Sequence, residues 1–276
     1  MLSENHPRYR SPVRAVIFDW AGTVVDYGSR APVDAFIELF RRHGVTVTAE
    51  QARGPMGSHK RDHVRLILAM EPVAHQWQQR YGHAASAEDV DMLFRDFIPL
   101  QTELIGRYTD VIPGVAETVA LLRQQGIVFG ATTGYTRGMM STLLAQAAAG
   151  GFSPESNACA DEVPAGRPAP WMAITAAMQL GVYPMRACVK VGDTLVDIAE
   201  GLNAGMWTVG ITKTGNELGL SAAEVQALPA HELASRLNTA SNRFLQAGAH
   251  FVIPDVAELP AVITEINERL ARGERP

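Results

Sequence analysis

Short β-rich runs alternate along this chain with segments of helical periodicity, and this alternation constrains the possible fold more than any other feature. Repeated strand–helix–strand units build a parallel sheet that is covered by helices. We expect five strands, at Ala15–Asp19, Ile127–Thr132, Ala187–Val191, Trp207–Ile211 and His250–Ile253. The sequence therefore predicts an α/β fold in which ligands bind where the carboxyl ends of the strands meet.

A different pattern occupies the segment from about residue 30 to residue 107, which has helical periodicity and no good strand. Apolar side chains recur there at i, i+3, i+4 and i+7, as in Val33, Phe36, Ile37 and Phe40. We therefore expect a catalytic core formed by residues 1–28 and 106–276, with an all-helical domain of residues 29–105 inserted after the first strand.

Two helix starts can be predicted from capping residues. Ser58 is a plausible N-cap for a helix that runs to about Met70, and Ser86 for a longer helix. From about Ser221 onward the tail has the pattern of helix, edge strand and helix, with no chemistry that we can assign.

Composition excludes several classes of protein. With 47% hydrophobic and 19% charged residues and a net charge of −5, the chain has the composition of a globular protein and no basic footprint for nucleic acid or an anionic membrane. No apolar run approaches the ~18 residues of a membrane span, and the opening MLSENHPRYR lacks the apolar region of a secretory signal. Cys159 and Cys188 form no disulfide framework, so we expect a cytoplasmic enzyme.

Carboxylates follow two of the expected strands. Asp19 ends the first, and Asp193 follows Ala187–Val191 with Asp197 one helical turn beyond it. Each could merely cap a turn or a helix. Together they form the oxygen-rich set that Mg²⁺ prefers when a phosphoryl group completes its coordination, and Asp19 could also be a nucleophile.

Anion-binding groups follow the other expected elements. Thr133 and Gly134 follow a strand and open a helix, where a hydroxyl and free backbone N–H groups can hold a phosphate. Arg167 lies between prolines in PAGRPAPW, and a fixed guanidinium suits phosphate oxygens, although an exposed loop arginine is the commoner case.

In order, D-W-A-G-T, T-G, R-P and G-D-T-x-x-D resemble the four motifs of the haloacid dehalogenase superfamily. The resemblance implies a Rossmann-like parallel sheet core with an inserted all-helical cap domain. One position departs from the pattern: phosphatases of this superfamily usually place a general acid two residues after the nucleophile, where this chain has Ala21. Alanine cannot protonate an alkoxide, so either the chain is a degraded phosphatase or its leaving group needs no acid at this position.

Lys60 supports the second alternative. The chain has only three lysines, and this one lies in GPMGSHKRDHV at the start of an expected helix, where the macrodipole disfavours an ammonium. We expect neighbouring Arg61, His59 and His63 to lower the pKa of Lys60 further. A neutral amine can condense with an aldehyde, and the resulting protonated imine can accept the electrons of a breaking P–C bond without a general acid at residue 21.

On these residues the chain resembles the phosphonoacetaldehyde hydrolases, the phosphonatase branch of the superfamily. The motifs concerned are D-W-A-G-T at 19–23, G-S-H-K at 57–60, T-T-G-Y-T at 132–136, G-R-P-x-P-W at 166–171 and G-D-T-x-x-D at 192–197. The resemblance implies hydrolysis of phosphonoacetaldehyde to acetaldehyde and phosphate, within 2-aminoethylphosphonate degradation, by a Mg²⁺-dependent homodimer. It also implies that Mg²⁺ binds Asp19, Asp193 and the Ala21 carbonyl with Asp197 behind them, and that Met56, His63 and Tyr135 belong to the substrate pocket.

The expected mechanism has Lys60 form a Schiff base with the aldehyde while Thr133, Gly134 and Arg167 hold the phosphonate. Asp19 then attacks phosphorus and forms an aspartyl-phosphate that water hydrolyses. We expect His63 to shuttle protons during imine formation.

Three alternatives remain open. A Mg²⁺-dependent phosphomonoesterase or sugar-phosphate mutase would share the core but favour an aspartate at residue 21 and need no reactive cap lysine. A haloacid dehalogenase would leave the Asp193/Asp197 pair unexplained, and a non-catalytic phosphate-binding protein would bind without turnover.

Overall fold

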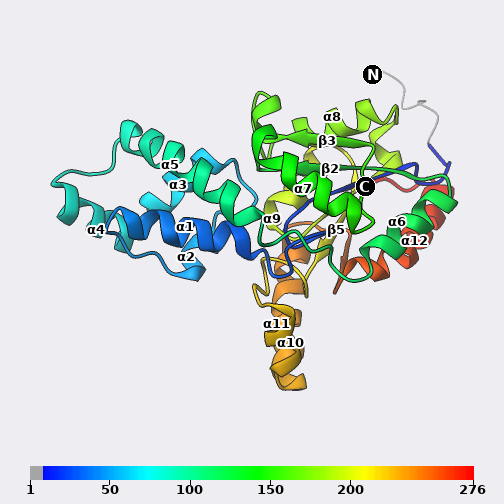
Figure 1. The fold of residues 1–276 in the computed structure, drawn as a ribbon. Coiled ribbons are helices and arrows are strands. Elements are labelled where there is room, and N and C mark those ends of the chain that lie inside the picture. Colours follow the sequence, from blue (N-terminus) through cyan, green and yellow to red (C-terminus); the bar gives the residue numbers. More distant parts are fainter. Residues whose placement is uncertain (1–8) are drawn as a thin grey trace, which may run out of the picture.

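The structure, a computed structural model, describes residues 9–276. Residues 1–8, part of the expected core segment 1–28 and of the MLSENHPRYR stretch, lie outside the described residues. In the described chain, all the strands form one parallel sheet in the order β3-β2-β1-β4-β5-β6 (Figure 1). The strands are β1 (Ala15–Phe18), β2 (Val128–Thr133), β3 (Ser156–Cys159), β4 (Cys188–Gly192), β5 (Trp207–Ile211) and β6 (Phe251–Ile253). The α/β prediction is confirmed, because each of the five expected runs overlaps a strand.

One of the six strands, β3, is not among the five that we expected from the sequence. Its sequence is SNAC, and it pairs only with β2, with Gly130 opposite Ser156. An edge strand this short carries too few β-branched or aromatic residues to produce a recognisable pattern. Backbone pairing with β2 makes it a strand, and that pairing depends on tertiary structure.

Helices cover both faces of the sheet because successive side chains of each strand alternate in direction. Val16 and Phe18 of β1 face the main hydrophobic core, whereas Ala15 and Ile17 face a second, smaller core. On the first face lie α6 (Val115–Gln124), α7 (Arg137–Ala149) and α12 (Leu259–Ala271), and on the second α8 (Trp171–Gln179), α9 (Leu195–Asn203) and α11 (Ala230–Gln246). Short elements connect them: α10 (Ala222–Ala227) and 3₁₀ turns at Ala160–Glu162, Met185–Ala187 and Val256–Glu258.

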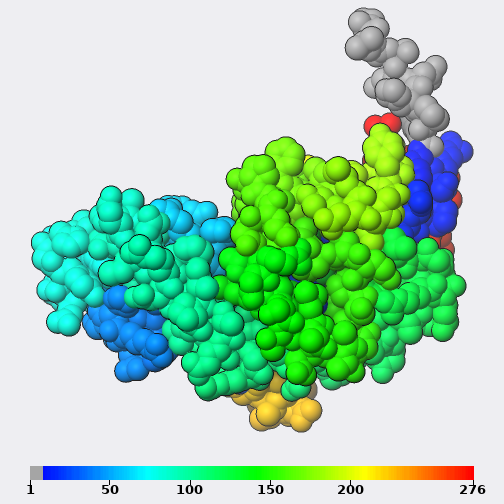
Figure 2. Space-filling model, turned by 45° about the horizontal axis from the view of Figure 1, so that its top comes forward, coloured from blue at the N-terminus to red at the C-terminus, as the bar shows by residue number. Residues whose placement is uncertain are grey.

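Five helices follow β1 and form a lobe beside the sheet, coloured blue to blue-green in Figure 2. They are α1 (Arg30–Arg42), α2 (Ala49–Arg53), α3 (Lys60–Leu68), α4 (Glu71–Tyr81) and α5 (Ala87–Ile105). Helix α5 packs on α1 and α3, around buried aromatic residues that include Phe36 and Phe97. No helix of the described chain is both long and apolar enough to cross a membrane.

The helix starts were predicted with mixed success. Ser86 caps α5 in a capping box with Asp89, as expected. Ser58 does not cap α3: its hydroxyl donates to the Pro55 carbonyl at 2.6 Å, and the His59 side chain accepts from the backbone N–H of Arg61 instead. The predicted tail is confirmed by α10, α11, β6 and α12.

Candidate active site

The chemistry-bearing residues gather at the carboxyl ends of three adjacent strands. Strand β1 lies between β2 and β4, so Asp19 after β1, Thr133 at the end of β2 and Asp193 after β4 meet at one edge of the sheet. In this strand order the crevice forms where the chain reverses direction across the sheet, beside β1. Topology therefore brings Asp19 together with two residues that lie more than a hundred positions further along the sequence.

A pocket at this edge is enclosed by the sheet loops and by the helical lobe. Nine of the expected site residues line it: Asp19, Ala21, Met56, Lys60, Thr133, Gly134, Tyr135, Arg167 and Asp193. It is also lined by Ser29, Pro32, Gly57 and Thr194.

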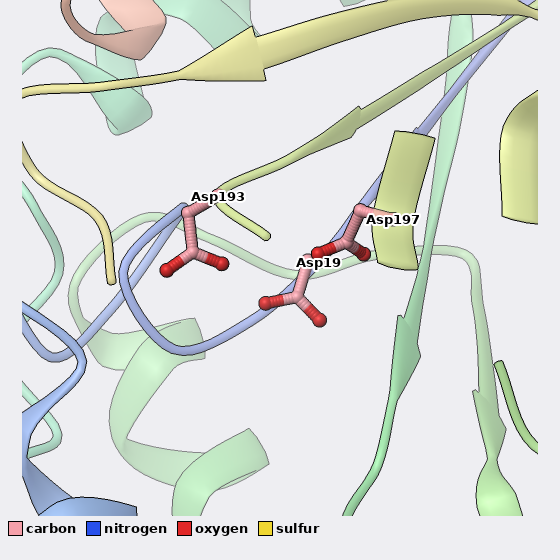
Figure 3. Close-up of side chains that lie close together, drawn as sticks. All are labelled: Asp19, Asp193 and Asp197. Atoms are coloured by element: carbon pink, nitrogen blue, oxygen red, sulfur yellow. The ribbon is translucent and has the colours of Figure 1, made fainter. Parts of the chain in front are cut away.

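Three buried carboxylates converge beside this pocket (Figure 3). Asp19, Asp193 and Asp197 each offer an oxygen within 4.8 Å of the others. Burial, followed by the charges of its two neighbours, raises the pKa of Asp193 well above its usual range, and burial and Asp197 likewise raise the pKa of Asp19. One oxygen of Asp193 accepts the Asn216 N–H at 2.7 Å, while Oδ1 is buried with no hydrogen-bond partner in residues 9–276. Mutually repelling carboxylates with an unpartnered oxygen fit a divalent cation.

Asp197 has a different environment from the other two carboxylates. Its Oδ1 lies 2.7 Å from Lys190 Nζ and 3.1 Å from Arg167, and its Oδ2 accepts the Thr194 hydroxyl at 2.5 Å. Although burial opposes ionisation, Arg167 and Lys190 lower the pKa of Asp197. Both of its oxygens already have partners within the protein. This suits a residue that holds neighbouring side chains in place rather than one that binds a cation directly.

Arg167 is fully enclosed, contrary to the exposed loop position that is commoner for an arginine of this kind. Only 5% of its surface is exposed. Nη1 lies 2.7 Å from Asp19 Oδ1, Nε donates to Glu200 at 2.9 Å, and Nη2 donates to the hydroxyl of Thr132 at 2.6 Å. Glu200 and Thr132 thus hold Nε and Nη2 of the guanidinium, and Nη1 is directed toward Asp19.

Lys60 projects from the first turn of α3 into the pocket and is only 3% exposed. Burial lowers the pKa of its amine to about 8, and the charge of Arg167 acts in the same direction, while Asp19 and Asp193 oppose it. Its Nζ lies 5.3 Å from the centre of the Tyr135 ring. The expected direction of the shift agrees with this environment.

One of the causes that we expected for this shift, positive charge on Arg61, His59 and His63, is wrong. Arg61 points away and pairs with Asp91 at 2.5 Å, with 37% of its side chain exposed. Burial lowers the pKa values of His59 and His63 and thereby disfavours a positive charge on either ring. The pKa of the Lys60 amine is lowered by burial in the pocket, which is a feature of the tertiary structure. Positive charge next to Lys60 in the sequence is not the cause.

His63 lies behind Lys60 and does not line the pocket. Its Nε2 is 2.8 Å from the Ala52 carbonyl, so Nε2 carries the proton, and its ring stacks on Phe36 with 3.9 Å between ring centres. Nδ1 is buried and has no hydrogen-bond partner among the described residues. This placement does not support the direct substrate contact that we expected of His63.

Sequence reasoning missed the role of four residues here. Ser29 and Pro32 line the pocket from the start of α1, where the sequence indicated only a helix. Glu200 and Lys190 are fully buried beside Arg167. A lysine inside the apolar strand ACVKV was a signal that a buried carboxylate lies opposite it, but its partner could not be identified from the sequence.

The chain was compared with known proteins. The family model of the haloacid dehalogenase-like hydrolases matches residues 13–205. A phosphonoacetaldehyde hydrolase-like protein of Syntrophobacter fumaroxidans is 49% identical over 100% of this chain and 99% of its own length. A phosphonoacetaldehyde hydrolase of Nitratidesulfovibrio vulgaris is 48% identical over 97% of this chain and 96% of its own.

Solved structures agree with these relatives. A phosphonoacetaldehyde hydrolase-like protein of Oleispira antarctica superimposes with a TM-score of 0.98 at 44% identity, covering all of both chains. The matches to the family model, to both relatives and to the solved structure all include the strands and loops that form the pocket. The chain therefore belongs to the haloacid dehalogenase-like hydrolases and, within them, to the family of the phosphonoacetaldehyde hydrolases.

Proposed function

We propose that this chain hydrolyses the P–C bond of phosphonoacetaldehyde and releases acetaldehyde and phosphate, as a step of 2-aminoethylphosphonate degradation. The observation that carries the proposal is the buried amine of Lys60, which shares one pocket with Asp19 and Arg167. Ala21 lines the same pocket at the position of the usual general acid. An amine for the aldehyde, a carboxylate for phosphorus and no acid for an alkoxide together fit a carbon leaving group.

Lys60 begins the reaction. Its neutral amine adds to the aldehyde carbon and expels water, which leaves a protonated imine two bonds from phosphorus. A pKa of about 8 leaves about a tenth of the amines neutral at pH 7, compared with less than about a thousandth for an ordinary lysine.

Asp19 then attacks phosphorus. As the new O–P bond forms and the C–P bond breaks, the bonding electrons move into a C=C bond and neutralise the imine nitrogen, which gives an enamine and an aspartyl-phosphate. Water cleaves the aspartyl-phosphate, while the enamine takes a proton on carbon and is hydrolysed to acetaldehyde and free Lys60. We assign the phosphonate oxygens to Thr133, Gly134 and Arg167, which line the pocket beside Asp19.

We propose Mg²⁺ as the cation of this site, held by Asp19, Asp193 and the Ala21 carbonyl, with Asp197 behind them. The unpartnered oxygen of Asp193 supports this choice. When bound, the ion would neutralise charge on the phosphonate and on the carboxylates.

Three further residues complete the proposal. Met56 and Tyr135 are both buried and line the pocket with Lys60, and we assign to them the exclusion of water from the imine. His63, if it shuttles protons, does so from behind Lys60, since its free Nδ1 is buried and its Nε2 is held by Ala52.

The covalent step is tested by reducing the enzyme with borohydride in the presence of phosphonoacetaldehyde, followed by peptide mass analysis. We expect an adduct on Lys60 and none on Lys190 or Lys213. Active enzyme without a Lys60 adduct would remove the Schiff base from the mechanism. A coupled acetaldehyde assay, compared with phosphate release from an aryl phosphate, separates this function from a phosphomonoesterase or sugar-phosphate mutase.

We also propose a division of the chain and a state of assembly. Residues 29–105 would act as a cap domain on a core of residues 1–28 and 106–276, which agrees with the helical lobe after β1. As the family resemblance implies, we propose a cytoplasmic homodimer; light scattering should then give about twice the chain mass of 29.8 kDa.

A further inference from the structure

Glu200 holds the edge of Arg167 that faces away from the pocket. It lies on α9, one turn after Asp197, and is fully buried. Its Oε2 accepts Arg167 Nε at 2.9 Å and the Thr132 hydroxyl at 3.3 Å, and lies 3.5 Å from Lys190 Nζ. Glu200 itself does not line the pocket.

The consequence for Asp19 follows from the geometry of guanidinium groups. Arginine and a carboxylate prefer to pair through two parallel hydrogen bonds. Here only Nη1 reaches Asp19, on Oδ1 at 2.7 Å, because Nε is bound to Glu200 and Nη2 to Thr132. A guanidinium free to rotate would bind both oxygens of Asp19.

We propose that Glu200 is a positioning residue that keeps Arg167 from binding Asp19 through two hydrogen bonds and thereby leaves one carboxylate oxygen free to attack phosphorus. The inference rests on the proposed nucleophilic role of Asp19. Lys190 makes the arrangement possible, since a buried glutamate needs compensating positive charge and Lys190 is shared between Glu200 and Asp197.

The test substitutes Glu200→Gln, which keeps the shape of the side chain and an acceptor oxygen but removes its charge. We expect kcat for P–C cleavage to fall about 100-fold, because small misplacements of reacting groups cost about this much. KM should change less than about threefold. Borohydride trapping at Lys60 should be unchanged, because imine formation does not require Asp19 to attack.

Coupling to Arg167 is tested by repeating Glu200→Gln in an Arg167→Lys background, with adducts assigned by peptide mapping. Lysine has no Nε–H edge for Glu200 to hold, so the second substitution should change kcat less than about threefold. Asp255→Asn is the matched control: it removes another partly buried carboxylate, paired with Lys213 at 2.6 Å and outside the pocket, and should leave kcat unchanged.

Thr132→Val gives a second route should Glu200→Gln fold poorly. It removes the hydroxyl that accepts from Arg167 Nη2 but leaves every charge in place, and we expect kcat to fall about tenfold, the value of one hydrogen bond to a charged group.

Unchanged kcat in both variants would overturn the proposal, and so would an equal loss in the Arg167→Lys background or a parallel loss of Lys60 trapping. Wild-type enzyme that released phosphate only from an aryl phosphate would instead overturn the P–C assignment. The same Glu200 comparison is then made on that substrate, because it depends only on attack by Asp19.

Discussion

Lys60 is distinguished at the residue scale by what its amine lacks. Lys190 lies 2.7 Å from Asp197 and Lys213 lies 2.6 Å from Asp255, whereas Lys60 makes no salt bridge within residues 9–276. A buried ammonium without a carboxylate partner is unstable relative to the neutral amine. Among the three lysines, only Lys60 is therefore prepared to act as a nucleophile near neutral pH.

The pH dependence of Lys60 provides a direct prediction. Because burial lowers its pKa to about 8, its reaction with a trace acylating reagent should rise between pH 7 and 9 and then level off. An exposed model lysine keeps gaining reactivity up to its pKa of about 10.4. Peptide mass analysis of Lys60 and of a lysine-containing peptide in the same tube measures both curves; a Lys60 midpoint near the model value would contradict the assignment.

Asp193 should control the response to metal. In Asp193→Asn an amide replaces a carboxylate while Asn216 N–H keeps an acceptor, so we expect the protein to fold. The increase in Tm that Mg²⁺ gives to wild type should fall by most of its value, because one of the anionic ligands is gone. Asp255→Asn should retain the full increase; equal increases in Asp193→Asn and wild type would place the metal elsewhere.

At the scale of elements, the segment between α2 and α3 is a part of the helical lobe that packs against loops at the edge of the sheet. Gly57 has φ +85°, and a Cβ there would lie 2.5 Å from both Thr194 Oγ1 and Val196 Cγ2. Gly134 also lies close to this segment, with 3.0 Å between its Cβ position and the Ser58 carbonyl oxygen. The segment that delivers Lys60 thus lies directly on the loops that carry Asp193 and Thr133.

Gly57→Ala should show whether the contact between the Lys60 segment and the core affects activity separately from stability. A methyl group there must push the Lys60 segment off the core, and we expect kcat/KM to fall about 10–100-fold. Gly82→Ala is the control, because Gly82 has a similar φ of +78° but no atom within 4 Å of its Cβ position. Both variants should lose about 1 kcal/mol of stability from backbone strain, measured by denaturant unfolding. Equal kcat/KM values in the two would show that the contact has no role.

Across the whole molecule, Arg53 connects the helical lobe to the core. It ends α2, and its guanidinium donates to the carbonyls of Gly28 at 2.8 Å and Gly219 at 2.9 Å. Asn216, whose backbone N–H binds Asp193, lies 3.3 Å from the same guanidinium. One side chain therefore links the helical lobe, the chain that leads into it and the loop whose Asn216 binds Asp193.

Removal of this link should favour an open arrangement of the lobe. For Arg53→Met we expect KM to rise about tenfold, because about 1–2 kcal/mol of charge-assisted hydrogen bonding is lost from the closed form. Limited proteolysis should become faster in the segments next to residues 28 and 106. Arg65→Met removes an exposed arginine, 3.5 Å from Asp62, and should resemble wild type in both measurements. A KM for Arg53→Met equal to that of wild type would contradict a role in closure.

The sequence by itself determined the strand–helix alternation, the helical insert and most of the pocket-lining residues, because strand tips and capping patterns are local features. It could not reveal β3, whose SNAC sequence becomes a strand only beside β2, nor that His59 and not Ser58 caps α3. Only the tertiary structure decided why Lys60 is reactive and how Arg167 is held. The burial of Lys60 and the contacts that hold Arg167 against Glu200 both arise only when separate elements of the chain pack together.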